Sequence, residues 1–328
     1  MICWNRSFRS CVIFHPLREE RERKETMTLQ EEILELKKRH NAVILAHNYV
    51  GGEVQDIADF SGDSLELSIR AKNVNAPLIV FCGVRFMAET AKLLSPDSTV
   101  LLPDPDAGCP MANMASALAV KAMRQKHPDA VYCAYVNSTA ETKSQIDICC
   151  TSGNVENVLN SIPAEKEIVF LPDRNLGANM GAKLNRNMIL WDGCCPVHDA
   201  VTPESIRAAR TAHPGAEVLI HPECRPETIA ECDKAMSTGG ILRYVRESDK
   251  KEFIIATEYG IMHRLKKENP GKEFYHIDPP IICRDMKMIT LEQVRDSLRD
   301  GKTEVILPAD VMRDAVKPIE KMIALPAK

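Results

Sequence analysis

The sequence predicts an α/β fold of three similar α/β/α sandwich domains, with parallel sheets in a pseudo-threefold arrangement around a central site. Three observations predict it. The 328-residue chain repeats itself about every 87 residues. Each repeat alternates short buried strands with amphipathic helices, which is typical of parallel sheets covered on both faces. Each repeat also places polar residues at its strand ends, where ligands bind in open α/β sheets.

The first strand of each repeat is a short apolar run that ends in polar residues. These runs are NAVILAHNY at 41–49, AVYCAYVNS at 130–138 and AEVLIHPE at 216–223. Their end residues His47, Tyr135 and His221 are 88 and 86 positions apart. A second set of strands keeps nearly the same spacing, in PLIVFCG, EIVFLPD and EFIIATE. A third set ends near cysteines, in LLPDPDAGC, ILWDGCC and IDPPIIC.

Helices are expected between these strands. SGDSLELSIRAK, CTSGNVENVLNSI and STGGILRYVRE follow the first strands, and RFMAETAKLL, NLGANMGAKL and YGIMHRLKKE follow the second strands. Each helix of the first group opens with a small hydroxylated residue, Ser64, Ser152 or Thr238, that is expected to cap it. Hydroxyl and backbone N–H groups at helix N-termini also hold anions, and capping and ligand binding are compatible.

The repeats divide the chain into predicted domains at residues 27–112, 113–198 and 199–288. Residues 289–328 contain TLEQVRDSLRDG, a predicted strand TEVILP and the helix ADVMRDAVKPIEKMIA. This segment begins a fourth unit that stops early, and we expect it to pack back on the first domain. Residues 1–26 are interpreted as a disordered N-terminal extension, because Met27 immediately precedes an amphipathic helix.

Composition excludes several classes of protein. The chain is 45% hydrophobic and 27% charged, with a mean hydropathy of -0.20, as in ordinary globular proteins. No apolar run reaches the roughly 18 residues that a membrane span needs. A net charge of -4 and a pI near 6.2 lack the basic excess typical of nucleic-acid binding. We therefore expect neither a membrane nor a nucleic acid as a partner.

Twelve cysteines are the unusual feature of the composition. A disulfide framework requires export, but the N-terminus does not resemble an export signal, because its apolar run CVIF is short and is followed by REERERKE. Reduced thiols in a cytoplasmic protein are therefore expected. No compact CxxC spacing groups the cysteines, so twelve inert buried thiols remain an alternative to any metal site.

Three of these cysteines occupy matching positions in the repeats. Cys109 and Cys195 are 86 residues apart, and Cys195 and Cys283 are 88 apart, so pseudo-threefold symmetry would bring them to one point. Three thiolates with one open coordination position suit an iron–sulfur cluster whose fourth iron is free to bind substrate. Cys194 competes with Cys195 as the second ligand, since the spacing favours Cys195 by only one residue.

The strand ends supply candidate groups for binding substrate and moving protons. These residues are His47, Asn48, Tyr49, Tyr135, Asn137, His221 and Glu223. Glu223 is the only acid among them and is the candidate general base or acid, although it could instead be an ordinary surface carboxylate. The chain lacks GxxxxGK[ST], GxGxxG after its first strand, HExxH and GxSxG, which argues against nucleotide hydrolysis and standard dinucleotide binding.

Ten motifs occur in one order from about Met27 to the C-terminus: AHNYV, GDSLELS, PDAGCPMA, YVNSTAETK, CTSGN, LPDRNLG, GCCPVH, HPEC, STGG and CRDMKM. In these motifs the chain closely resembles the quinolinate synthase family. The resemblance implies three α/β/α domains around a 4Fe-4S cluster held by Cys109, Cys195 and Cys283. His198, three residues after the ligand in GCCPVH, selects Cys195 over Cys194 on this reading.

The resemblance also implies a reaction, in which iminoaspartate condenses with dihydroxyacetone phosphate to give quinolinate, phosphate and two waters for NAD biosynthesis. The open iron would act as a Lewis acid, and L-aspartate oxidase is an implied functional partner. The implied catalytic residues are Glu223, Tyr49 and His221. The implied substrate contacts are His47, Ser64, Tyr135, Asn137, Ser152, His221, Glu223 and Thr238. An iron–sulfur hydro-lyase of another hydroxy acid and a non-enzymatic iron–sulfur sensor are the alternative functions.

Overall fold

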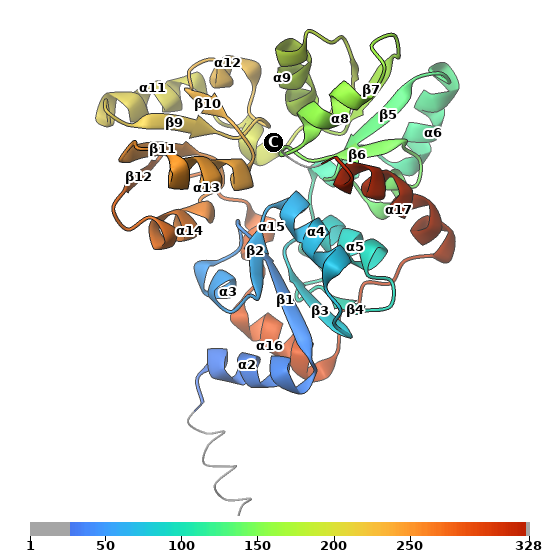
Figure 1. The fold of residues 1–328 in the computed structure, drawn as a ribbon, viewed down its shortest axis with the longest axis vertical. Coiled ribbons are helices and arrows are strands. Elements are labelled where there is room, and N and C mark those ends of the chain that lie inside the picture. Colours follow the sequence, from blue (N-terminus) through green and yellow to red (C-terminus); the bar gives the residue numbers. More distant parts are fainter. Residues whose placement is uncertain (1–26, 326–328) are drawn as a thin grey trace, which may run out of the picture.

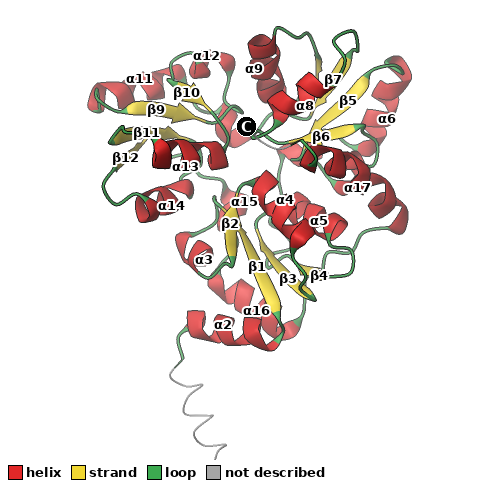
Figure 2. Ribbon diagram, viewed as in Figure 1, coloured by secondary structure: helices red, strands yellow, loops and turns green. Residues whose placement is uncertain are grey.

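The computed structural model describes residues 27–325, so the extension predicted at 1–26 lies outside the described residues. Within 27–325 the strands form three four-stranded sheets, and every pairing inside them is parallel. Helices pack on the sheets, and the three sheets are grouped around the centre of the molecule (Figure 1; Figure 2). The prediction of three similar α/β/α units is confirmed.

The first unit contains a sheet of order β2-β1-β3-β4. Its strands are β1 (Ala42–His47), β2 (Phe60–Gly62), β3 (Leu78–Cys82) and β4 (Thr99–Leu101). Its helices are α2 (Leu29–Arg39), α3 (Gly52–Asp56), α4 (Ser64–Asn73) and α5 (Arg85–Leu94). The central strands β1 and β3 are buried along almost their whole length, as expected for parallel strands that are covered on both faces.

The second unit repeats this order as β6-β5-β7-β8. Its strands are β5 (Val131–Tyr135), β6 (Ile148–Cys150), β7 (Ile168–Leu171) and β8 (Ile189–Leu190). Its helices are η1 (Met111–Met114, a 3-10 helix), α6 (Ala117–Lys126), α7 (Ala140–Lys143), α8 (Val155–Ser161) and α9 (Arg174–Leu184).

The third unit has the order β10-β9-β11-β12. Its strands are β9 (Glu217–Ile220), β10 (Lys234–Ala235), β11 (Glu252–Ala256) and β12 (Glu273–His276). Its helices are α10 (Pro196–Asp199), α11 (Pro203–Ala212), α12 (Pro226–Ile229), α13 (Thr238–Glu247) and α14 (Ile261–Glu268). The predicted boundaries near residues 112 and 198 fall inside η1 and α10, and as domain boundaries they stay predictions.

Each sheet holds one strand more than the sequence predicted. The additional strands β2, β6 and β10 lie at sheet edges, and each is only two or three residues long. Strands of this length are too short to show an apolar period, so the sequence does not distinguish them from the loop before the next helix. They keep the repeat spacing nevertheless, since Phe60, Ile148 and Lys234 begin them at intervals of 88 and 86 residues.

The C-terminal segment differs from its prediction in two ways. The predicted strand TEVILP forms only a single antiparallel bridge, between Glu304 and Leu101. After α15 (Arg284–Lys287), the helix α16 (Leu291–Asp300) packs on α2 of the first unit. The last helix α17 (Ala309–Ile323) packs on α5 of the first unit but also on α7 and β6 of the second (Figure 1). The segment therefore joins the first and second units.

None of the helices in the described range 27–325 combines the length and the apolar character needed to cross a bilayer.

The side chain of Asn154 ties the C-terminal helix to the turn before α8. Its Nδ2 donates to the carbonyls of Met322 (2.9 Å) and Leu325 (2.7 Å), and its Oδ1 accepts from the backbone N–H of Thr151 (2.8 Å). Because Asn154 is buried, its removal would leave these partners without hydrogen bonds. We expect Asn154→Ala to lower the free energy of unfolding by about 1–3 kcal/mol in denaturant titrations.

The control for this substitution is Asn73→Ala. Asn73 is exposed at the end of α4, where its Nδ2 donates to the carbonyl of Ile69. Its replacement should change the free energy of unfolding by less than about 0.5 kcal/mol. Equal losses in the two variants would contradict the anchoring role of Asn154.

Candidate active site

The carboxyl ends of the three sheets border one cavity of about 560 Å³. Twelve of the thirteen residues that the sequence placed at a shared central site line this cavity; the exception is Asn48, whose Oδ1 accepts from Arg264 instead. The twelve are His47, Tyr49, Ser64, Cys109, Tyr135, Asn137, Ser152, Cys195, His221, Glu223, Thr238 and Cys283. They meet because the side chains that follow parallel strands lie at one edge of each sheet, and the three edges face one another.

The three matching cysteines each lie next to the start of a short helix. Cys109 precedes Pro110 and η1, Cys195 is the N-cap of α10, and Cys283 is the N-cap of α15. Burial raises the pKa of the Cys109 thiol to about 12 and that of Cys283 to about 11, and it raises the pKa of Cys195 well above its usual range. Binding of a metal by these thiols must therefore release protons.

The donor set suits a thiolate-ligated metal or cluster. The three thiols of Cys109, Cys195 and Cys283 line the same cavity. All ten cysteines between residues 27 and 325 are free thiols, and none is taken up in a disulfide. Three soft donors, one from the end of each unit, fit an iron–sulfur cluster or zinc. Cys194 does not border the cavity and lies beside Arg174 instead.

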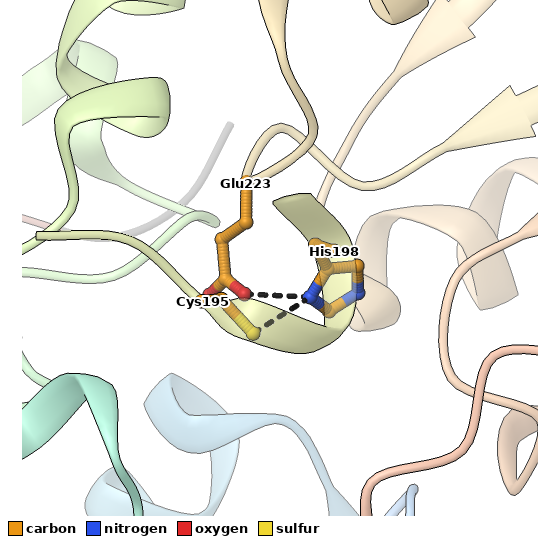
Figure 3. Close-up of side chains that lie close together, drawn as sticks. All are labelled: Cys195, His198 and Glu223. Carbon is orange, nitrogen blue, oxygen red and sulfur yellow. Dashed lines mark hydrogen bonds and ion pairs between the residues drawn. The ribbon is translucent and has the colours of Figure 1, made fainter. Parts of the chain in front are cut away.

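Cys195 also belongs to a group that can hold a metal ion. Its sulfur, a ring nitrogen of His198 and a carboxylate oxygen of Glu223 lie within 4.8 Å of one another (Figure 3). The Nδ1 atom of His198 is 2.8 Å from Oε2 of Glu223 and 3.3 Å from Sγ of Cys195. Thiol, imidazole and carboxylate are all common metal ligands, so this corner of the cavity is a possible metal site.

Glu223 is buried, with 3% of its surface exposed, which excludes the alternative of an ordinary surface carboxylate. Burial by itself would raise the pKa of this carboxyl group. The nearby rings of His221 and His198 and a hydrogen bond from the Tyr135 phenol more than offset that effect and hold the pKa well below its usual range. Glu223 is therefore ionised at neutral pH, which is the form in which a carboxylate can act as a base.

A chain of hydrogen bonds leads from Glu223 to Tyr49. His198 binds Glu223 through Nδ1, and its Nε2 is 3.0 Å from Oγ1 of Thr257. The same Thr257 oxygen is 2.5 Å from the phenol oxygen of Tyr49. Burial raises the pKa of Tyr49 well above 10, so its phenol is neutral and can donate a proton. Thr257 and His198 can therefore connect the phenol of Tyr49, an acid, to the carboxylate of Glu223, a base.

The sequence did not predict two residues of this hydrogen-bond series, Thr257 and His198. Thr257 follows the second strand of the third repeat, and the second strands were predicted only as buried parts of the sheets. The polar pair TE directly after EFIIA indicates that this strand end also carries candidate site residues. His198 entered only as a motif position that selected Cys195. A histidine three residues after a candidate ligand lies one helical turn away, and this spacing could have identified it as a site residue.

The hydroxyl groups at the helix starts do not act as the predicted caps. Asp63 caps α4 and Ser237 caps α13, in each case one residue earlier than expected. Ser64 and Thr238 are consequently the first helical residues, and both line the cavity. Ser152 lies in the turn before α8, where its Oγ is 3.2 Å from Nε2 of His221. The hydroxyl groups of Ser64, Ser152 and Thr238 therefore do not cap these helices.

Two polar atoms that border the cavity are not hydrogen-bonded within residues 27–325. Oδ1 of Asn137 and Nδ1 of His221 are buried and make no hydrogen bond within the part of the chain that the structure describes. Buried polar atoms are normally satisfied, so unpaired ones that border a cavity point to a ligand. These two atoms are therefore suited to bind a polar substrate.

Two buried histidines should make the stability of the protein depend on pH. Burial lowers the pKa of His47 to about 3 and that of His221 to about 4, and it outweighs the opposing effect of the Glu223 carboxylate on both rings. In the unfolded chain both should titrate near about 6.5. Between these values the unfolded state binds more protons, so the stabilisation is complete above about pH 6.5 and is lost as the pH falls toward 4.

We expect urea titrations of the cluster-free protein to show a lower free energy of unfolding at pH 5 than at pH 7.5. The double variant His47→Gln and His221→Gln should reduce this difference, because it removes the two groups that must take up protons. An unchanged difference in the double variant would contradict the assignment.

The site defines an α/β enzyme with a possible metal site. It combines parallel α/β units, thiols that line one cavity and a buried carboxylate paired with histidine.

Comparison with known proteins identifies the family of this enzyme. The family model described as quinolinate synthetase A protein matches residues 31–324. The chain is similar to a protein named quinolinate synthase from Methanoregula boonei, with 50% identity over 92% of this chain and 99% of the relative.

Two further relatives bear the same name. The protein from Desulforudis audaxviator is 49% identical over 90% of this chain and 97% of its own, and that from Pelobacter propionicus is 48% identical over 91% and 98%. The chain belongs to the quinolinate synthetase A family. Membership agrees with the resemblance in its motifs, and it gives no support to a hydro-lyase of another hydroxy acid or to a sensor.

Proposed function

We propose that the protein is a quinolinate synthase, a transferase that condenses iminoaspartate with dihydroxyacetone phosphate in NAD biosynthesis, releasing phosphate and two waters. One observation carries the proposal: a cysteine from each unit, hydroxyl groups at three helix starts and the ionised Glu223 all line one cavity. Family membership over residues 31–324 adds to it.

Cys109, Cys195 and Cys283 would hold the cofactor, a 4Fe-4S cluster with one iron left open. The support is the set of three soft donors around one cavity. When bound, the cluster supplies a Lewis acid that polarises a carbonyl group or helps hydroxide leave. Free thiols and such a cluster suit a reducing compartment, which is why we place the enzyme in the cytoplasm.

The anionic groups of the substrates would bind at the helix starts. Ser64, Ser152 and Thr238 provide hydroxyl donors beside backbone N–H groups, which suit carboxylate and phosphate oxygens. His47 and the amide of Asn137 border the same space. His47 is neutral at pH 7, so it binds as a hydrogen-bonding group and not as a cation.

Glu223 and Tyr49 would move protons. The ionised Glu223 accepts a proton from a substrate carbon or nitrogen, and the neutral phenol of Tyr49 donates one to a departing hydroxide. Thr257 and His198 connect the two groups and can return the proton. Tyr135 donates to Glu223, and His221 lies between Ser152 and Glu223, with Nε2 3.2 Å from Oγ of Ser152 and Nδ1 3.8 Å from Oε2 of Glu223.

The partners are the two small substrates and, functionally, an oxidase of L-aspartate. Iminoaspartate is an imine that water hydrolyses, so it must be generated close in time to its use.

The test is anaerobic reconstitution of the chain with iron and sulfide, followed by an assay with dihydroxyacetone phosphate and freshly generated iminoaspartate. Quinolinate and phosphate are expected in equal amounts. A brown, cluster-containing protein that forms neither product would overturn the proposal.

A further inference from the structure

Glu258 is a fully buried carboxylate that borders the cavity but has no role in the proposed reaction. It follows the end of β11, in the turn that leads to α14. Its Oε1 accepts from the backbone N–H of Cys283 at 3.1 Å, and its Oε2 accepts from the backbone N–H of Gly260 at 2.6 Å. One side chain thereby joins the turn after β11 to the loop that carries a candidate cluster ligand.

Lys287 completes the environment of Glu258. Its Nζ is 2.8 Å from Oε1 and 3.0 Å from Oε2 of the carboxylate, and it also donates to the backbone carbonyl of Tyr49. Burying a charge is costly unless it is paired, and here an ammonium group and two N–H groups compensate it. The ion pair thus connects the third unit to the first at the candidate proton donor.

Two neighbouring contacts support the same connection. Nε2 of Gln55 donates to the carbonyl of Gly260 at 3.0 Å and to that of Val50 at 3.0 Å, which holds the turn after β11 against the Tyr49 loop. Asp285, in α15 with Lys287, accepts from the backbone N–H of Gly108 at 3.1 Å, next to Cys109. The short helix α15 therefore contacts two of the three cysteine loops and the Tyr49 loop.

We infer that Glu258 is a positioning residue that holds Cys283 in its ligand position and, through Lys287, fixes the backbone of Tyr49. The inference rests on the proposed function, since it gives these two residues their roles. Groups that hydrogen-bond to the surroundings of a metal ligand usually affect metal affinity about 10- to 100-fold. A negative charge beside a cluster also lowers its reduction potential.

Two substitutions of Glu258 separate these effects in the reconstituted full-length protein. Glu258→Gln keeps the size and a carbonyl acceptor but removes the charge, so the cluster should still load while its midpoint potential, measured by EPR-monitored titration, rises. Glu258→Ala removes the acceptor as well. We expect its cluster to lose iron to a chelator about 10-fold faster than the wild type.

Glu89 provides matched controls. It is also buried, at 5% exposed, and accepts a backbone N–H, that of Ala140, at 2.9 Å, but it does not border the cavity. Glu89→Gln and Glu89→Ala should leave the potential and the rate of iron loss unchanged. Iron loss from Glu89→Ala as fast as from Glu258→Ala would overturn the inference, because general loosening of the fold would then explain both.

Lys287→Met tests the connection to Tyr49 separately from the Glu258 variants, because it removes the ammonium group but keeps the Glu258 carboxylate and its hydrogen bonds from Cys283 and Gly260. We expect wild-type iron content with a kcat reduced severalfold and little change in KM. A wild-type kcat would overturn the link to Tyr49, and wild-type potential and iron loss in both Glu258 variants would overturn the link to Cys283. A wild-type protein that loads no cluster or makes no quinolinate would instead overturn the proposed function.

Discussion

Glu223→Gln is expected to reduce kcat about 10²- to 10⁴-fold, the usual contribution of a general acid or base, while the iron content stays at the wild-type level. The physical reason is the ionised state of Glu223, which its histidine neighbours maintain inside a buried site. An amide keeps the shape and a hydrogen bond to His198 but cannot accept a proton. The measurement is quinolinate formation under anaerobic conditions, with iron determined on the same samples.

Glu227→Gln is the control, because Glu227 lies four residues further along, is exposed and contacts Arg225 only at 3.6 Å. It should be as active as the wild type. A Glu223→Gln enzyme with full turnover and an intact cluster would remove Glu223 from the proton path.

Cys195→Ser is expected to abolish both the visible absorbance of the reconstituted protein and its activity, whereas Cys194→Ser should preserve both. The two thiols are adjacent in the chain, but only Cys195 borders the cavity, together with Cys109 and Cys283. Serine is nearly the same size as cysteine but is a poor ligand for iron–sulfur clusters. Comparison of the two variants therefore shows which of the two cysteines is the ligand. Loss of the cluster in Cys194→Ser with retention in Cys195→Ser would reverse the assignment.

The repeat of about 87 residues made the fold predictable. Each buried strand and the residues at its end recur at a fixed spacing, so three sheets and a shared site followed from the positions of His47, Tyr135 and His221. The edge strands β2, β6 and β10 were not predicted, because their two or three residues show no apolar period. The position of α17 was not either, since an amphipathic helix fixes which face is buried but not which unit it meets.

The candidate site was predictable where residues recur in register and not where they act in one unit alone. Glu223 stood out as the only acid among the first-strand ends. Thr257 and Glu258 lie in one polar pair of the third unit, and their contacts with Tyr49 and Cys283 join positions that are distant in sequence. Helix capping was misplaced by one residue at Ser64 and Thr238, because Asp63 and Ser237 are equally good capping residues.

The packing of α17 on both the first and second units bears on how the protein is made. The three thiols lie at positions 109, 195 and 283, and the helix that joins the first and second units begins at Ala309. A nascent chain therefore offers no complete set of three thiols until Cys283 has left the ribosome. If these thiols hold the proposed cluster, iron and sulfide can be bound by the full donor set only after all three units have been synthesised.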